Sequence, residues 1–552
     1  MVVKVVIQLC REPNTGSWKK LTQHSIASSQ SICDIIDMAV RAQDWIARHA
    51  VRYADKVAAV DLHTGRRHSY HQLHRRIGGL AGYLRDHCSV QPGERIAHLG
   101  PSTTDVFEIQ FACQRLGAIF LPLNWRLALP ELNFIVGDAE PAVLFYDQEF
   151  TETAQALSSD NLRHRVEMRV DGEGSLYEQA VASASLVEKM VSATHDDVIA
   201  IMYTSGTTGR PKGALLTHGM TFYNAVNLSG PAQITKDAVH LVVLPLFHTG
   251  GLNCYSNVVF HAGGTNLVVR SFDVTECLKQ LLDPELGVTH FFGVPNHYQA
   301  MSELPEFAEA SLGHLVTCGV GAAPCPHTML EIWGEKSVPL QQGYGLTETS
   351  PTVLVLEHHE AMRRLGSAGL PAMHTDVRLV RADGEDVSNP GEVGEIWVRG
   401  PNVTPGYFNR EEATRLAFDG EWLKTGDAAT RDQDGYYTIV DRWKDMYISG
   451  GENVYPAEVE DAIYELDAVA EVAVVGIKDE KWGEVGLAVI ALKANHSVSA
   501  EDVIEHCRSR LARFKAPKSV RFVDSLPRNA SGKVRKHELT EPLRIESGRG
   551  GA

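Results

Sequence analysis

Residues 204–213, Thr-Ser-Gly-Thr-Thr-Gly-Arg-Pro-Lys-Gly, combine the residue types from which phosphate sites are built. Glycines let backbone N–H groups converge, hydroxyls donate to phosphate oxygens, and a lysine neutralises negative charge. So dense a pattern disfavours an ordinary surface turn and predicts a cradle for a triphosphate. Its members are Thr204, Ser205, Gly206, Thr207, Thr208, Gly209 and Lys212.

This run does not match the Walker A loop of common nucleotide-binding enzymes. Counting from Gly206, Pro211 stands at the second glycine position, and Gly213 stands where a serine or threonine would bind magnesium. A second glycine-rich run, residues 319–324, begins like a dinucleotide fingerprint but ends in Pro324. It is therefore weak support for a nicotinamide or flavin site.

The elements around the phosphate run alternate between strands and helices. Apolar stretches at 142–146, 198–203, 241–244 and 290–294 predict buried strands, and 275–282 predicts a helix between two of them. The strand at 198–203 leads into the phosphate run, and a helix is expected from Thr217. This alternation predicts an α/β fold with layers built on parallel sheets.

The chain divides into a large N-terminal part and a smaller C-terminal part. Regular patterning begins near Met38, in a helical stretch from Ala42 to His49, so the residues before it predict a disordered arm or an over-extended start. A C-terminal helix is expected at 456–466, strands near 472–477 and 486–492, and a further helix opened by a capping box at Ser499 to Asp502. The predicted divisions are 1–37 (arm), 38–441 (N-terminal domain), 442–445 (charged hinge) and 446–552 (C-terminal domain).

Composition narrows the classes of partner. The net charge of −17 argues against sequence-independent binding of nucleic acid, because that binding requires phosphate neutralisation. No run of about 18 apolar residues exists, so no membrane span is predicted. The 9 cysteines are scattered without a CxxC pair, which is typical of reduced thiols and predicts a cytoplasmic protein.

Seven segments in order resemble the signature motifs of the adenylate-forming superfamily, which contains acyl-CoA synthetases, peptide-synthetase adenylation domains and beetle luciferases. The resemblance extends over about residues 42–540 and is closest to medium-chain fatty acid or aryl carboxylate CoA ligases. The segments are residues 203–213, 245–251 (Pro-Leu-Phe-His-Thr-Gly-Gly), 342–349 (Gln-Gly-Tyr-Gly-Leu-Thr-Glu-Thr), 394–400, 422–427, 441–444 with 449–456, and 526–533.

The resemblance implies a fold and a two-step reaction. The expected fold is a large α/β N-terminal domain of several packed sheets and helices, followed by a small, mobile α+β C-terminal domain. ATP and Mg²⁺ would activate a carboxylate as an acyl-adenylate with release of pyrophosphate, and coenzyme A would then displace AMP to give a thioester. A medium-chain fatty acid or an aryl acid is the expected substrate.

The resemblance also assigns roles to individual residues. The expected catalytic residues are Lys533, Glu348, His248 and Lys212. Outside the phosphate run, the ATP and AMP contacts would be Gly321, Ala322, Ala323, Gly343, Tyr344, Gly345, Thr347, Glu348, Asp427, Arg442 and Lys533. Thr204 and Glu348 would hold the metal, Lys444 would be the hinge, and coenzyme A would contact Ser449, Gly450, Gly451 and Trp482. The acyl pocket would use His248, Asn224, Asn227, Val320 and Gly345.

Several alternatives remain open from the sequence. A stand-alone adenylating enzyme that loads a carrier protein in trans would share these motifs, as would a luciferase. A non-catalytic binding protein is disfavoured because the expected catalytic residues are all present. An amino-acid substrate is disfavoured because Thr249, not an aspartate, follows His248. A homodimer is also compatible with the resemblance.

Overall fold

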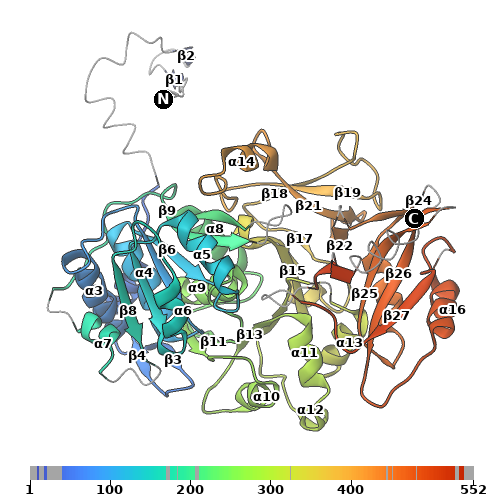
Figure 1. Ribbon diagram of the computed structural model, residues 1–552, viewed down its shortest axis with the longest axis horizontal. Helices are drawn as coiled ribbons and strands as arrows, with labels where there is room; N and C mark the ends of the chain where they lie inside the picture. Colours follow the sequence, from blue (N-terminus) through green and yellow to red (C-terminus); the bar gives the residue numbers. More distant parts are fainter. Residues whose placement is uncertain are drawn as a thin grey trace, which may run out of the picture.

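The computed structural model describes most of the chain beyond residue 39. The described residues are 9–11, 18–20, 40–169, 174–182, 185–204, 211–323, 325–442, 445–449, 452–479, 482–511, 513–528, 534–536 and 538–539. Figure 1 shows the N-terminal strands and helices on one side of the molecule and the C-terminal sheet on the other.

A six-stranded sheet carries the start of the predicted phosphate run. Its order is β10-β9-β6-β5-β7-β8, and the strands are parallel except β10, which pairs antiparallel with β9 at the edge. The strands are β5 (Arg95–Leu99), β6 (Ile119–Leu123), β7 (Val143–Asp147), β8 (His164–Met168), β9 (Val198–Thr204) and β10 (Lys212–Thr217).

Helices cover both faces of this sheet. Alternate strand residues point to opposite faces, so Ile96 packs with α3 and α4 while Ala97 and Leu99 pack with α5. The helices of this part are α2 (Trp45–Arg52), α3 (Tyr70–Asp86), α4 (Thr104–Leu116), α5 (Leu129–Ala139), the 3-10 turn η2 (Gln148–Phe150), α6 (Thr151–Ala156) and α7 (Leu176–Val181).

A nine-stranded sheet combines two early strands, β3 and β4, with later ones, in the order β17-β16-β15-β14-β13-β11-β12-β3-β4. Its central strands, from β3 to β15, are parallel, and its outer strands are antiparallel. The strands are β3 (Val57–Asp61), β4 (Arg67–Ser69), β11 (Val239–Val242), β12 (Thr265–Val268), β13 (His290–Gly293), β14 (Thr317–Val320), β15 (Leu340–Gly345), β16 (Thr352–Val355) and β17 (Leu370–Pro371).

Two groups of helices enclose this second sheet. Leu278 of α10, Tyr298 of α11 and Trp333 of α13 form one buried cluster with its strands, and residues of α8 and α9 form another. The elements are α8 (His218–Ser229), the π-helical segment η3 (Gly250–Ser256), α9 (Asn257–Ala262), α10 (Val274–Leu282), α11 (Pro295–Ser302), α12 (Pro305–Glu309), α13 (His327–Glu335), and the 3-10 turns η4 (Thr347–Thr349) and η5 (His358–Glu360).

Two antiparallel-rich sheets complete the fold. The third sheet contains β18 (Asp376–Val380), β19 (Gly394–Arg399), β20 (Phe418–Asp419), β21 (Trp422–Arg431) and β22 (Tyr437–Arg442), with helix α14 (Glu411–Ala417) beside it. The C-terminal sheet contains β23 (Tyr447–Ser449), β24 (Glu452–Val454), β25 (Val469–Asp479), β26 (Gly483–Leu492) and β27 (Ser519–Val523), with helices α15 (Pro456–Tyr464) and α16 (Ala500–Arg510). Gln299 of α11 donates to the backbone of Ala470 at 3.3 Å, so β25 contacts the nine-stranded layer.

The structure differs from the sequence-based expectations in four places. The phosphate run joins two strands, since β10 precedes the expected helix α8, whose N-cap is Thr217. The early helix begins only at Trp45, because the Asp44 side chain caps it. Ser499 caps α16, but its hydroxyl donates to the Asp502 carboxylate, so the reciprocal backbone bond of a capping box is absent here. Within the predicted arm, β1 (Leu9–Arg11) and β2 (Trp18–Lys20) pair antiparallel.

Buried histidines predict a loss of stability in mild acid. Burial lowers the pKa of His98, His218 and His290 to about 4 and that of His240 to about 3. An unfolded histidine titrates near 6.5, so below that pH the unfolded chain binds protons that the native fold rejects. Each group should lower the free energy of unfolding by about 1.4 kcal/mol per pH unit between about pH 6.5 and 4.

Thermal unfolding between pH 7.5 and 5 would measure this effect. His218→Gln should flatten the pH dependence, whereas His359→Gln should not, because the side chain of His359 is 72% exposed. Melting temperatures that do not change with pH over this range would contradict the prediction.

Candidate active site

The two ends of the predicted phosphate run lie side by side. Thr204, the last residue of β9, pairs with Lys212, the first residue of β10, and both side chains are half-buried. Residues 205–210 lie outside the described residues, so Ser205, Gly206, Thr207, Thr208 and Gly209 are not placed. The hairpin therefore returns Lys212 to the point at which the run begins.

Glu348 lies beside this hairpin and is held at two points by the segment 404–407. The backbone N–H of Thr404 donates to the Glu348 carbonyl at 2.7 Å, and the Tyr407 hydroxyl donates to Glu348 Oε1 at 2.9 Å. Tyr407 forms a β-bridge with Ala214 of β10, and its ring centroid is 5.3 Å from Lys212 Nζ. Burial, and then the Glu348 charge, raise the pKa of Tyr407 far above its usual range. The hydroxyl is therefore protonated and can donate.

A carboxylate with the chemistry of a ribose acceptor lies on the neighbouring sheet. Asp427 of β21 is buried, and its Oδ2 accepts a hydrogen bond from the Tyr344 hydroxyl at 2.7 Å. Its backbone N–H donates to Thr425 Oγ1 at 3.1 Å, directly after Gly426, which has a left-handed φ of 73°. Arg442 pairs with Asp427 through the backbone of β22, and its side chain lies outside the described residues.

Small residues follow β14 at the point where the chain passes close to Tyr344 on β15. A Cβ on Gly321 would lie 3.1 Å from the Gly343 carbonyl oxygen, so the two backbones approach closely. Ala322 has a left-handed φ of 68°, and both it and Ala323 are exposed. The carboxyl ends of parallel strands such as β14 and β15 are where open α/β sheets bind ligands. A flat ring could therefore lie against this exposed turn.

The amides predicted for the acyl pocket are already hydrogen-bonded. Asn224 of α8 donates to the Asn253 carbonyl at 2.8 Å and accepts from the Thr352 N–H at 3.1 Å. Asn227 donates to Thr375 Oγ1 at 3.2 Å and accepts from the backbone N–H of residue 374 at 2.9 Å. Both amides therefore tie α8 to neighbouring segments.

The other three residues predicted for the acyl pocket lie at the ends of β14 and β15 and in the loop after β11. Val320 ends β14 and is 1% exposed, within the core cluster of the nine-stranded sheet. His248 follows β11, is half-buried, and accepts the Gly250 N–H on Nδ1 at 3.1 Å. Gly345 ends β15, where an added Cβ would lie 1.5 Å from the Pro351 carbonyl oxygen.

The residues expected to contact coenzyme A are only partly described. Ser449 ends β23 and is buried, while Trp482 is 40% exposed and its backbone N–H donates to Asp479 Oδ1 at 2.9 Å. Gly450, Gly451, the hinge residue Lys444 and Lys533 all lie outside the described residues. Their roles remain predictions.

The donor set suits a magnesium ion bound together with substrate phosphates. Thr204 offers a hydroxyl and Glu348 a carboxylate whose Oε2 makes no hydrogen bond to another described residue. Mg²⁺ prefers such oxygen ligands and usually takes one or two from the protein, with phosphates and waters completing its shell. Among the described residues, no group of three or more His, Cys, Asp or Glu side chains is arranged to hold a metal alone.

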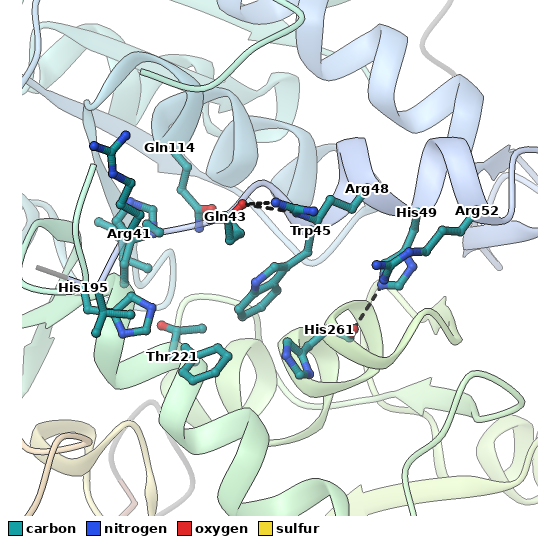
Figure 2. A pocket seen from close by; sticks show the side chains of 15 residues that line it. Arg41, Gln43, Trp45, Arg48, His49, Arg52, Gln114, His195, Thr221 and His261 are labelled. Atoms are coloured by element: carbon teal, nitrogen blue, oxygen red, sulfur yellow. Dashed lines mark hydrogen bonds between the residues drawn. The ribbon is translucent and has the colours of Figure 1, made fainter. Parts of the chain in front are cut away.

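A separate cavity of about 320 Å³ lies between α2 and α8 (Figure 2). The Trp45 ring meets His261 edge to face at 4.9 Å, and Arg48 donates to Gln43 at its rim. Among the described residues, none of the site residues predicted from sequence lines it. Thr221 of α8 faces this cavity, whereas Asn224 and Asn227 make their hydrogen bonds elsewhere.

Tyr407 and Thr404 were not predicted from the sequence. Both lie in residues 401–408, Pro-Asn-Val-Thr-Pro-Gly-Tyr-Phe, directly after the recognised motif that ends at Gly400. An aromatic residue after a Pro-Gly turn is a weak signal, because such turns are common at surfaces. The contact with Glu348 joins residues 59 positions apart and becomes visible only in the fold.

These features have the chemistry that a nucleotide site requires: a strand pair that ends in a threonine and a lysine, a hydroxyl and a carboxylate that suit a cation, and a buried carboxylate. The family model described as "AMP-binding enzyme" matches residues 46–408. The family model described as "AMP-binding enzyme C-terminal domain" matches residues 458–533. The chain belongs to the AMP-binding enzyme family. The predicted class, an AMP-forming acyl-CoA synthetase of α/β architecture, is confirmed.

Characterised relatives match almost the whole chain. A feruloyl-CoA synthase from an Amycolatopsis species is 42% identical over 495 residues, covering 90% of this chain and 97% of that one. An indoleacetate–CoA ligase from Aromatoleum aromaticum is 38% identical over 502 residues, covering 90% of this chain and 97% of that one.

No helix in the described part of the chain is long and apolar enough to cross a bilayer.

Solved structures agree with the fold. ATP-bound MatB from Rhodopseudomonas palustris aligns with a TM-score of 0.84 at 32% identity, covering 91% of this chain and 99% of that one. The o-succinylbenzoate CoA synthetase MenE from Bacillus subtilis, in complex with its acyl-adenylate intermediate, aligns with a TM-score of 0.80 at 31% identity, covering 91% and 99%.

Proposed function

We propose that this carboxylate–CoA ligase acts on an aryl acid of the cinnamate or arylacetate type. The chemistry is the attack of a substrate carboxylate on the α-phosphorus of ATP, with pyrophosphate leaving. The thiol of coenzyme A then attacks the acyl carbonyl, and AMP leaves. The observation that supports the adenylation step is that Tyr407 contacts both the Glu348 carboxylate and Lys212. The buried Asp427, which accepts from Tyr344, would lie at the nucleotide end of this site.

Individual residues would divide the first step among them. Lys212 and the hydroxyls of the phosphate run would bind the β- and γ-phosphates, and Asp427 would accept the ribose hydroxyls. Thr204 and Glu348 would hold Mg²⁺, which would neutralise phosphate charge when bound. Lys533 would lie between the substrate carboxylate and the α-phosphate, stabilising the charge that develops there.

The second step would use a different arrangement of the C-terminal domain. Rotation about Lys444 would remove Lys533 from the site and bring the Ser449–Gly451 turn towards the adenylate. Glycine suits the wall of a narrow pantetheine channel, since a side chain would obstruct it. His248 would separate that channel from the acyl group, and Trp482 would contact the nucleotide end of coenzyme A. These roles are proposals by resemblance.

The aryl preference is supported by relatives that carry aromatic acids in their names, among them the feruloyl-CoA synthase and the indoleacetate–CoA ligase. Asn224 and Asn227 each use the amide oxygen and one N–H in bonds within the fold, which holds them in place beside α8. A medium-chain fatty acid is the second candidate. An aliphatic acid is supported by a relative from Mycobacterium tuberculosis, 36% identical, which is named a long-chain-fatty-acid–CoA ligase.

Other features stay predictions. A carrier protein loaded in trans remains the alternative acceptor to coenzyme A, and a homodimer is untested. The divisions at 37, 441 and 445 and the cytoplasmic location also remain predictions. The location is supported by seven cysteines that are free and buried: Cys88, Cys113, Cys254, Cys277, Cys318, Cys325 and Cys507.

A coupled assay of acid-dependent AMP release tests the proposal. Ferulate, cinnamate, indoleacetate, benzoate and octanoate would each be offered with ATP, Mg²⁺ and coenzyme A. We expect AMP and pyrophosphate, with kcat/KM highest for an aryl acid, and activity that requires coenzyme A. ADP and phosphate as products would contradict the mechanism, and octanoate as the best substrate would contradict the aryl preference alone.

A further inference from the structure

We propose that Tyr407 is a positioning residue for the adenylation step, which fixes the Glu348 carboxylate for its cation and supports the Lys212 ammonium. This inference deepens the proposed function and rests on it. One tyrosine would thereby set the separation between the two charges that face the triphosphate. Tyr407 lies outside the seven sequence motifs.

The backbone around Tyr407 is anchored on both sides. The Leu215 N–H donates to the Gly406 carbonyl at 3.1 Å, and the Phe408 N–H donates to the Gly213 carbonyl at 2.8 Å. The Tyr407 N–H itself donates to Thr414 Oγ1 at 2.9 Å. The segment therefore lies along the edge strand β10 as an added strand would, and the ring has a fixed origin.

The side chain of Tyr407 then contacts both charged residues. Its hydroxyl donates to Glu348 Oε1, while Oε2 is left without a hydrogen bond to another described residue. Its ring lies 5.3 Å from Lys212 Nζ, within the range of a cation–π contact. In the described part of the chain, Lys212 forms no ion pair with a carboxylate. One carboxylate oxygen is thus pinned, the other remains available for a cation, and the lysine is held without being neutralised.

A nearby tyrosine provides a matched control. Tyr203 precedes the phosphate run on β9, is also half-buried, and donates to Asp138 Oδ2 at 2.7 Å. Arg410 also contacts Asp138, and the Tyr203 ring packs with the α5 face of the six-stranded sheet. A phenylalanine at either position removes one hydrogen bond to a carboxylate, but only the change at 407 reaches Glu348.

The experiment compares Tyr407→Phe, Tyr407→Leu and Tyr203→Phe in the full chain. Mn²⁺ binding in the presence of a non-hydrolysable ATP analogue is followed by electron paramagnetic resonance, and adenylation by acid-dependent pyrophosphate exchange. Because a hydrogen bond to a charged group contributes about a 10- to 100-fold effect, Tyr407→Phe should weaken Mn²⁺ binding and lower the exchange kcat within that range. Tyr407→Leu should in addition raise the KM for ATP, since the ring beneath Lys212 is lost.

The controls separate positioning from folding. Tyr203→Phe should leave Mn²⁺ affinity and exchange within about twofold of the parent, with melting temperatures of the two phenylalanine variants alike. Equal Mn²⁺ affinity in Tyr407→Phe and the parent would overturn the inference, as would equal losses in the two phenylalanine variants. Absence of pyrophosphate exchange in the parent protein would instead overturn the proposed function, and the Mn²⁺ measurement would still test Tyr407.

Discussion

Lys533→Ala is expected to slow acyl-adenylate formation by orders of magnitude while leaving thioester formation from preformed acyl-adenylate close to the parent rate. Removing one charge-stabilising donor commonly costs about 10²–10³ in rate, and a full positive charge at the reacting centre can cost more. The second half-reaction should not depend on Lys533, because the proposed rotation about Lys444 carries its loop away. Pyrophosphate exchange measures the first step, and AMP release from synthetic acyl-adenylate plus coenzyme A measures the second.

A variant of the proposed hinge should lose the second half-reaction and keep the first, which is the opposite of the result expected for Lys533→Ala. Lys444→Pro should spare pyrophosphate exchange and impair thioester formation, because proline fixes φ near −65° and the hinge must change its dihedral angles. If Lys533→Ala lowered both half-reactions equally, the two-conformation mechanism would be wrong for this protein, even with ligase activity established.

Gly345→Ala should cause the second large loss of adenylation activity. The cause would be a steric clash with the backbone and not the loss of a charge. An ideal Cβ at Gly345 would lie 1.5 Å from the Pro351 carbonyl oxygen and 2.5 Å from its carbon. The end of β15 would have to move away from the segment that leads into β16. This movement would displace Tyr344 and Thr347 from their positions. Displacements of about 1 Å at a reacting site can cost about 10²-fold in rate, and overpacking commonly costs about 1–3 kcal/mol of stability.

Gly343→Ala, two residues earlier on β15, is the matched control. Its Cβ would meet the Leu354 carbonyl oxygen at 3.4 Å, which is an ordinary contact. The melting temperature should therefore fall markedly for Gly345→Ala and little for Gly343→Ala. Pyrophosphate exchange in Gly345→Ala should fall by about 10²-fold. Equal melting temperatures for the two variants would contradict the steric argument.

Much of the architecture followed from apolar patterning. The stretches predicted as strands at 142–146 and 290–294 became β7 and β13, and the helix at 275–282 became α10. These elements are buried runs bounded by polar residues, so burial alone identifies them. Strand β10 was missed because Lys212–Thr217 contains β-branched threonine only at its end, so its local strand propensity is low. Pairing with β9 supplies the stability that the segment lacks.

The site was predictable to the extent that it lies within contiguous motifs. Thr204, Lys212, Glu348 and Asp427 could be named because their neighbours in sequence identify them. The contacts between motifs could not, since they depend on how separate sheets are placed. The Tyr344–Asp427 hydrogen bond joins the nine-stranded sheet to the third sheet, and no local pattern encodes such a pairing.

The placement of β3 in the nine-stranded sheet has a consequence for how the protein is made. Val60 of β3 pairs with Leu267 of β12, which is synthesised about 200 residues later. At ribosomal rates of about 5–20 residues per second, β12 would be synthesised about 10–40 s after β3. During that interval Ala58, Ala59 and Val60 form an unpaired strand edge on the nascent chain. A lower growth temperature or an added chaperone should therefore raise the yield of folded protein. Changes to the C-terminal domain should raise that yield less.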